Sequence, residues 1–255
     1  MFVIIKTEKE KKILYEAGRR LALVLDEVEA LVRPGATSAE LNSHAERRIK
    51  EMGDVPSFLH YTPAGSRRPY PAGLCVSIND EVVHGIPSEE RLLKEGDIVG
   101  LDIGLRHEGL FVDMARTLPV GNVSKEARDL IFITKESLEA GILAAKSGGY
   151  VGDIGAAIEV VAKRGKLGIV RELGGHGVGE AVHEEPYIAN FGKTGTGEKL
   201  IDGMVLALEP MLTLGSPAVV LGKDGYTFRT RDGSLSAHFE HTIIVTPDGG
   251  EIVTC

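Results

Sequence analysis

GDIVGLD (residues 96–102) and GMVLALE (residues 203–209) repeat one pattern about a hundred residues apart. In each stretch a glycine precedes an apolar, strand-like run, and a carboxylate follows the glycine by six positions. Each stretch is followed by a second carboxylate at the head of another strand-like run. An apolar strand that ends in a carboxylate is costly unless the charge is paired or bound to a metal. Four such carboxylates from two similar halves predict a cage for two divalent cations: Asp102, Asp113, Glu209 and Glu240.

The repeat extends upstream of both stretches. Residues 8–33 carry apolar side chains at the i, i+3 and i+4 spacing of an amphipathic helix. In PGATSAEL, which follows, Thr37 and Glu40 are placed to form a capping box ahead of a second helix that reaches about Met52. The first half therefore reads as helix, helix and strands.

The second half repeats this order. A third helix is predicted from the Ser124 cap to about Lys146, and a fourth follows the break at SGGYVGDI and reaches about Lys166. We expect one α/β (α+β) domain, residues 1–255, made of two pseudo-symmetric halves at about 8–121 and 122–250. The alternative is a chance similarity among common βα patterns.

Composition narrows the class of protein. The net charge of −8 argues against nucleic acid as the main ligand. The N-terminal MFVIIKTEKEKK is neither a signal peptide nor a membrane span, because its apolar run is short. Two cysteines in 255 residues give no disulfide framework. A cytoplasmic protein without membrane or specific nucleic-acid partners fits best.

Three histidines stand in contexts that suit a site. His176 lies in GGHGVG, where flanking glycines let the backbone approach a ligand closely. His183 begins HEEP, and His84 ends an apolar run in VVHGIP. Taken alone, a histidine in a glycine-rich turn is more often structural. Beside the four carboxylates, His176 is a plausible fifth metal ligand.

The resulting ligand set is rich in oxygen, which suits Mn, Fe or Co, although Zn can occupy it. Two ions that share carboxylates can bind a bridging water, lower its pKa and polarise a neighbouring carbonyl. A hydrolase follows from this chemistry. The remaining two histidines, His84 and His183, would orient the substrate or stabilise charge on the attacked carbonyl.

These residues carry a family resemblance. The ligand order and the motifs SINDEVVHGIP, GGHGVG, HEEP, ALEP and SLSAHFEHT resemble those of type I methionine aminopeptidases, from about residue 5 to 253. The chain has neither the insertion of type II enzymes nor the zinc-finger extension of some eukaryotic type I enzymes, so it resembles the short bacterial form. The resemblance implies the pita-bread fold, in which helices cover a curved antiparallel sheet.

The resemblance also implies an activity, which is removal of the initiator methionine from nascent polypeptides through a metal-bound water or hydroxide. It implies two divalent ions (Co, Mn, Fe or Zn), a monomer and transient contact with the ribosome. Glu209 matches the general base as well as a ligand. His84 and His183 match two substrate-facing catalytic histidines, and Tyr70 and Cys75 match residues that line the methionine pocket. The matching metal ligands are Asp102, Asp113, His176, Glu209 and Glu240.

Two departures concern that pocket. Val182 and Gly233 stand where the family usually has large aromatic residues. We therefore expect a wider pocket with a looser preference for the first residue, unless the loop of residues 60–72, with Tyr61 and Tyr70, refills the space.

Two other functions compete with this interpretation. A proline-specific peptidase of the same fold would carry a large additional N-terminal domain, which 255 residues cannot hold. A binding module that keeps the fold would have lost metal ligands, and a metal assay separates it from an enzyme. The remaining histidines receive no catalytic role and are interpreted as structural, although those that flank Glu240 could support it: His44, His60, His107, His238 and His241.

Overall fold

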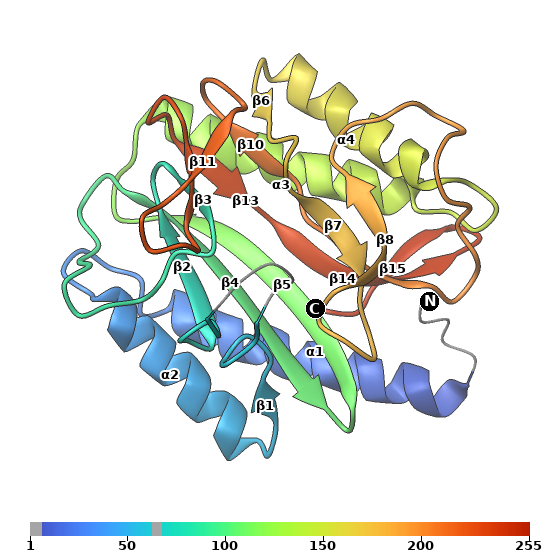
Figure 1. Cartoon of the computed structure of the whole chain (residues 1–255), viewed down its shortest axis with the longest axis horizontal. Coiled ribbons are helices and arrows are strands. Elements are labelled where there is room, and N and C mark those ends of the chain that lie inside the picture. Colours follow the sequence, from blue (N-terminus) through green and yellow to red (C-terminus); the bar gives the residue numbers. More distant parts are fainter. Residues whose placement is uncertain (1–6, 63–67) are drawn as a thin grey trace.

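The computed structural model describes residues 7–62 and 68–255 (Figure 1). Its helices match the predicted order, and each ends within a few residues of the predicted end. Residues 63–67 of the loop expected to refill the pocket lie outside the described residues. The helices are α1 (Glu8–Glu29), α2 (Ser38–Glu51), α3 (Lys125–Ala144) and α4 (Val151–Arg164).

The helix starts follow from their capping residues. At α1, Thr7 Oγ1 accepts from the Glu10 backbone N–H and the Glu10 carboxylate accepts from the Thr7 N–H, which is a complete capping box. At α2, Thr37 Oγ1 accepts from Glu40 N at 3.0 Å, as predicted. The Glu40 carboxylate bonds Arg33 rather than the Thr37 backbone, so only half of the capping box predicted there forms.

Within residues 7–62 and 68–255, the strands form one large antiparallel sheet and two small ones. The large sheet runs in the order β1-β4-β5-β14-β9-β7-β8, with β2 beside β4 and β15 beside β14. The small sheets run β13-β10-β6 and β11-β12-β3. Bounds of the strands are β1 Val55–Pro56, β2 Leu74–Ile78, β3 Glu81–Val83, β4 Ile98–His107, β5 Leu110–Pro119, β6 Gly168–Ile169, β7 Gly174–Gly177, β8 Glu184–Ala189, β9 Val205–Leu208, β10 Met211–Thr213, β11 Val219–Leu221, β12 Phe228–Thr230, β13 Ser236–His238, β14 Glu240–Thr246 and β15 Gly249–Ile252.

The long hairpin of β4 and β5 corrects one sequence expectation. Asp102 and Asp113 lie within these strands, not at a strand end and a strand head. The hairpin turns at Glu108 and Gly109, which both adopt positive φ, and pairs without interruption from Ile98 to His107. Both strands are therefore longer than the apolar runs that predicted them.

Alternation along this hairpin separates the core from the site. Leu101 and Ile103 of β4, with Val112 and Met114 of β5, are fully buried in the cluster that α1 and α2 cover. Since successive strand residues face opposite sides of a sheet, Asp102, Asp113 and Ala115 face the side away from this core. The apolar packing that holds the sheet therefore also aims the carboxylates.

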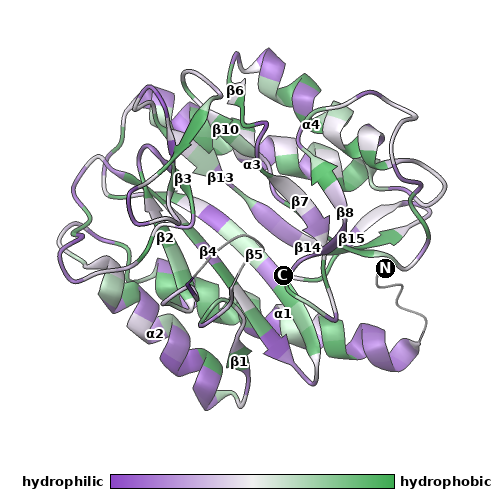
Figure 2. Ribbon diagram, in the orientation of Figure 1, coloured by the Kyte–Doolittle hydropathy of each residue, from purple (hydrophilic) through white to green (hydrophobic). Residues whose placement is uncertain are grey.

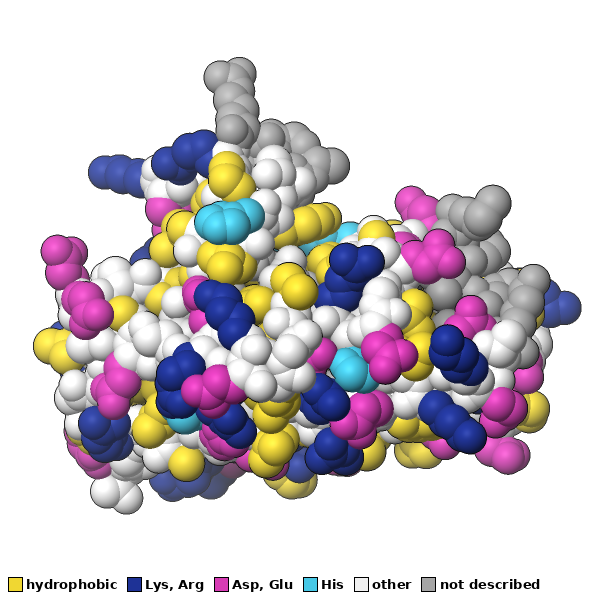
Figure 3. All heavy atoms as spheres, turned by 90° about the horizontal axis from the view of Figure 1, so that it is seen from below, with side chains coloured by type: hydrophobic (Ala, Val, Ile, Leu, Met, Phe, Trp, Pro, Cys, Tyr) yellow, Lys and Arg dark blue, Asp and Glu magenta, His cyan; other side chains and the backbone are white. Residues whose placement is uncertain are grey.

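The helices lie in two pairs, with α1 and α2 along one part of the sheet and α3 and α4 along the other (Figure 1). Their apolar stripes turn toward the strands and their polar stripes outward (Figure 2). On the face seen in Figure 3, basic and acidic side chains intersperse. On α2, Lys50 pairs with Glu46 and Arg47 pairs with Glu51. Among the described residues, no helix has both the length and the apolar composition to cross a bilayer.

Candidate metal centre

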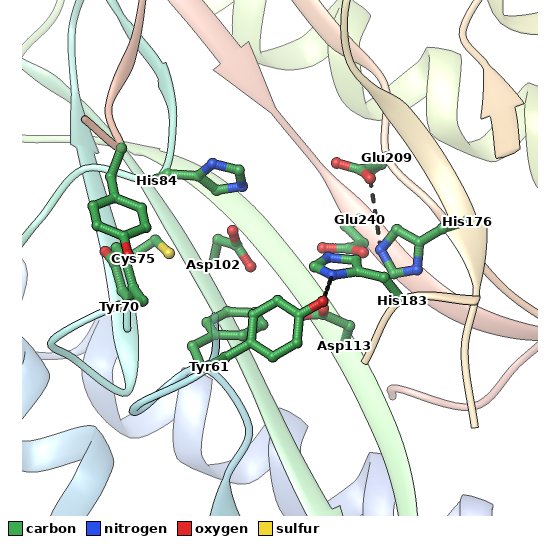
Figure 4. A pocket seen from close by; sticks show the side chains of 12 residues that line it. Tyr61, Tyr70, Cys75, His84, Asp102, Asp113, His176, His183, Glu209 and Glu240 are labelled. Carbon is green, nitrogen blue, oxygen red and sulfur yellow. Dashed lines mark hydrogen bonds and ion pairs between the residues drawn. The ribbon is translucent and has the colours of Figure 1, made fainter. Parts of the chain in front are cut away.

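Five neighbouring positions across the large sheet each supply one potential ligand. In sheet order, β4 carries Asp102, β5 carries Asp113, β14 begins with Glu240, Glu209 follows directly after β9, and β7 carries His176. Cross-strand pairing sets their spacing, because Asp102 and Glu240 both pair with Ala115, and His176 pairs with Ala207. All five side chains line one cavity (Figure 4).

Distances show how closely this group converges. Potential ligand atoms of Asp113, His176 and Glu240 lie within 4.8 Å of one another. Glu209 adjoins this trio, with its Oε1 at 3.7 Å from His176 Nε2. Asp102 lies beyond them on β4, toward Cys75 (Figure 4). The structure therefore brings together all five residues that the repeat and the glycine-rich motif singled out.

Burial makes the charged state of this cluster unfavourable without a cation. Burial raises the pKa of Asp102 to about 7 and that of Glu209 to about 8. Burial, and then the neighbouring carboxylates, raise the pKa values of Asp113 and Glu240 well above their usual range. Burial also lowers the pKa of His176 to about 3, which leaves a neutral imidazole that can bind a metal.

The donor atoms fit divalent cations. Asp102 Oδ1, Asp113 Oδ1 and Glu240 Oε1 are buried and have no hydrogen-bond partner within the described part of the chain. Buried polar atoms are rarely left unpaired, so three such oxygens facing one cavity indicate a ligand that supplies positive charge. Four carboxylates and one imidazole form an oxygen-rich set that suits Mn, Fe, Co or Zn.

Two further histidines face the same cavity. His84 directly follows β3 and adopts a positive φ of 61°, which is uncommon for residues other than glycine and is found at functional sites. The ring centroids of His183 and His176 are 4.5 Å apart. Nδ1 of His183 lies 2.8 Å from the Tyr61 hydroxyl oxygen. Burial lowers the pKa of His84 to about 4 and also lowers the pKa of His183. Both rings are therefore neutral near pH 7.

The other end of the cavity is apolar. Tyr70 and Cys75 line it there with Phe58 and Tyr226. Val182 belongs to the same buried cluster but does not line the cavity. The Tyr70 and Tyr226 rings meet edge to face at 5.3 Å. Burial raises the pKa of the Cys75 thiol, so the cysteine is a small wall residue and not a thiolate. The whole cavity encloses about 100 Å³.

The expected opening of the pocket at Gly233 stays a prediction. Gly233 lies in an exposed turn with φ of 74°, where an added Cβ would meet no described atom within 4 Å, and it does not line the cavity. Tyr226, which no sequence motif pointed to, lines the cavity, and its hydroxyl donates to the Arg68 carbonyl. Tyr61 and Tyr70 also line the cavity, as the alternative of a refilling loop required.

The sequence assigned the other histidines structural roles, with possible support of Glu240 for His238 and His241, and the structure separates these two. His44 bonds Glu27, His107 bonds Asp54 and His241 bonds Thr254, away from the cavity, as structural residues do. His60 is exposed.

His238 differs from them, since it is buried and its Nε2 lies 3.4 Å from Oε2 of Glu209. The signal in the sequence was its position two residues before Glu240. The same position is compatible with a structural role, so the signal did not decide between the two.

Comparisons with known proteins agree with this geometry. The model of metallopeptidase family M24 matches residues 12–247. Methionine aminopeptidase 1 of Bacillus subtilis (strain 168) is 44% identical over 252 residues, which cover 99% of each chain. These findings confirm the resemblance to methionine aminopeptidases that the motifs indicated.

Solved structures give the same result for the fold. The crystal structure of methionine aminopeptidase from Rickettsia prowazekii is similar with a TM-score of 0.95 and 39% identity, and each chain is covered fully. The crystal structure of methionine aminopeptidase from Thermotoga maritima is similar with a TM-score of 0.93 and 40% identity, and the comparison covers 100% of this chain and 99% of that chain. The expected pita-bread fold is thereby confirmed, and the chain belongs to metallopeptidase family M24.

Proposed function

We propose that this protein is a metal-dependent aminopeptidase that hydrolyses the N-terminal methionine from new polypeptides. One observation carries the proposal: a single cavity joins an acidic, cation-binding end to an apolar end lined by aromatic rings. The apolar end suits one unbranched apolar side chain, and the acidic end suits the free amine and the first peptide bond. The names of the relatives support methionine as that first residue.

Two divalent ions, Co, Mn, Fe or Zn, are part of this proposal, and their ligands would be Asp102, Asp113, His176, Glu209 and Glu240. The three unpaired carboxylate oxygens support this assignment. When bound, such ions would acidify a water molecule and polarise the scissile carbonyl.

The protein side chains supply the proton transfers. We assign Glu209 as the group that accepts a proton from the attacking water and passes it to the leaving amine, since it borders the cavity and its Oε1 lies 3.7 Å from His176 Nε2 in the ligand cluster. From this position one carboxylate can take the proton and release it again.

His84 and His183 are assigned to the substrate carbonyl. If the Tyr61 hydroxyl donates to His183 Nδ1, the ring carries its proton on Nε2 and can donate it. Both neutral rings would then stabilise negative charge that develops on the carbonyl oxygen. Tyr70 and Cys75 are assigned to the wall around the methionine side chain, and burial of both supports this.

We also propose a domain organisation, an oligomeric state and a location for the protein. Residues 1–255 would act as one catalytic domain with related halves at about 8–121 and 122–250, which the repeated order of two helices and then strands supports. Its substrates would be the N-termini of nascent polypeptides. Transient contact with the ribosome, a monomeric state and a cytoplasmic location go with such substrates.

A metal titration tests the proposal. Metal-free protein should hydrolyse a Met-Ala-type tripeptide only after Mn, Co, Fe or Zn is added, and should leave the N-acetylated peptide intact because it lacks a free amine. Preference for a peptide with proline in second place would favour the proline-specific alternative. No methionine release with any of the four metals would reject the function.

A further inference from the structure

His238 is buried beside the acidic end of the cavity and has no role in the function proposed above. Only 4% of its side chain is exposed, and its Nε2 lies 3.4 Å from Oε2 of Glu209. Within the described residues this nitrogen forms no hydrogen bond, and Glu209 is the carboxylate that lies within ion-pair distance of it. The charge of Asp102 also acts on this imidazole, but Asp102 makes no ion pair with it within 4.0 Å among the described residues. A small rotation of either side chain would turn the contact into a hydrogen bond.

The backbone around His238 is fixed. Thr117 Oγ1 donates to the His238 carbonyl at 2.8 Å and accepts from the His238 N–H at 2.9 Å. In addition, His238 pairs with Met211, which follows Glu209 by two residues. The imidazole therefore lies on β13, and the carboxylate lies two residues before the paired residue of β10, so backbone bonds between these strands set their relative position.

Glu209 has neighbours at both its backbone and its carboxylate. Its backbone carbonyl accepts from Asn190 Nδ2 at 3.0 Å. Its two carboxylate oxygens each face a different imidazole, with Oε1 toward His176 and Oε2 toward His238. His176 belongs to the converging trio of ligand atoms, whereas His238 does not. The two histidines thus have different relationships to the same carboxylate.

We propose that His238 is a positioning residue for Glu209, and that it donates from Nε2 to Oε2. This inference rests on the proposed role of Glu209 as the group that carries the proton. Held in this way, the carboxylate keeps one orientation toward the reacting atoms. A carboxylate that rotates freely would spend part of its time in unproductive orientations, which lowers kcat and leaves substrate binding unchanged.

The proposal is tested with variants of His238 whose side chains differ in whether they can reach Glu209 with a donor. Their kcat and KM are measured at saturating metal with a Met-Ala-type tripeptide. His238→Gln keeps a donor of similar reach, His238→Asn keeps an amide that stops short, and His238→Leu removes the donor. We expect kcat to fall about 10- to 100-fold in the Asn and Leu variants, with KM close to that of the parent, and to recover in the Gln variant. His241→Leu is the matched control, because His241 bonds Thr254 outside the cavity.

Three results would overturn the proposal. The first is a kcat in His238→Asn equal to that of the parent, and the second is an equal loss of kcat in the Gln and Asn variants. The third is the loss of one bound ion per chain from a His238 variant at saturating metal, which would make His238 a ligand. If His238→Leu does not fold, the Gln and Asn variants still decide between these outcomes. Failure of the proposed function would be separate, since the parent protein would then release no methionine.

Discussion

Asp102 and Glu240 lie on opposite sides of β5 and both pair with the same residue, Ala115. Directly paired residues of antiparallel strands project to the same face of the sheet. Ala115 therefore lies between the two carboxylates, with Asp113 two residues before it on that face. A methyl group at this position leaves the space that cations need.

We predict that Ala115→Val weakens metal binding by about tenfold or more, because the added methyl groups enter the space between the carboxylates. Calorimetric titration of the metal-free protein with Mn would measure the change. Met114→Leu is the control, since Met114 is fully buried on the opposite face and the substitution conserves volume. Equal affinity in the Val variant and the parent would contradict the placement of the cations.

We predict that Glu209→Gln lowers kcat by about 10²–10⁴, since an amide cannot accept the proton of the attacking water. The fold should remain, because the Asn190 bond to residue 209 uses the backbone carbonyl and not the side chain. A kcat measurement on a Met-initiated tripeptide, beside a thermal melt with metal, would separate the two effects. Turnover near that of the parent would remove Glu209 from the mechanism.

The helices and the acidic cluster could be predicted because local signals specify both. The helices show in the apolar spacing and in caps such as Ser124, whose Oγ accepts from Ala127 N at 3.1 Å. The cluster shows in a repeat that brings carboxylates to apolar strands. The sequence alone identified Asp113, His176 and Glu240 as candidate ligands. That their ligand atoms lie within 4.8 Å of one another follows only from the order of the strands in the sheet.

The pocket could not be predicted in the same way, because its walls come from segments that are far apart in the sequence. Tyr226 packs against Tyr70 across 156 positions of chain, and no local pattern links them. The expectation at Gly233 rests on sequence order alone, and the structure does not place this glycine at the cavity. Gly233 lies in the turn after β12, whereas the side chain that reaches the pocket precedes this strand.

We predict that His84→Ala and His183→Ala keep the bound metal and lose about 10²–10³ in kcat each, which is the usual effect of removing one charge-stabilising donor. Metal content by elemental analysis and kcat should be measured together. His44→Ala is the control, because His44 bonds Glu27 outside the cavity. A variant that no longer binds metal would show that the histidine is a ligand.

We predict that the stability of the metal-free protein falls as the pH rises from about 7 to about 9. In this range histidines are neutral in the unfolded chain, whose histidine pKa is about 6.5, and in the folded site. Burial gives Asp102 and Glu209 pKa values of about 7 and about 8, whereas unfolded carboxyls ionise near pH 4. The unfolded chain then binds fewer protons than the folded one, so stability declines with pH.

Bound metal should remove this decline, because cations bind the ionised carboxylates. Thermal melts with and without Mn across this pH range would measure it. The stabilisation by metal should grow with pH. A metal-free Tm that is constant or rises over this range would contradict the raised pKa values of the site.

The last prediction concerns the first residue of the substrate. Tyr226 packs against Tyr70 at the apolar end of the cavity and belongs to the same buried cluster as Val182. We predict that Tyr226→Ala raises KM for Met-initiated peptides and increases relative activity on larger first residues such as Phe. Each methylene that a pocket discriminates is worth about 1–3 kcal/mol, so the loss of a whole ring should exceed that effect.

Val182→Phe should act in the opposite direction and narrow the preference, because its side chain adds volume to the same cluster. Gly233→Asn is the control, since asparagine tolerates the positive φ of this exposed turn. The measurement is kcat/KM for peptides that begin with Met, norleucine, Leu and Phe. If Gly233→Asn changes this profile and Tyr226→Ala does not, residues other than Tyr226 close the pocket, and the assignment of its aromatic wall is wrong.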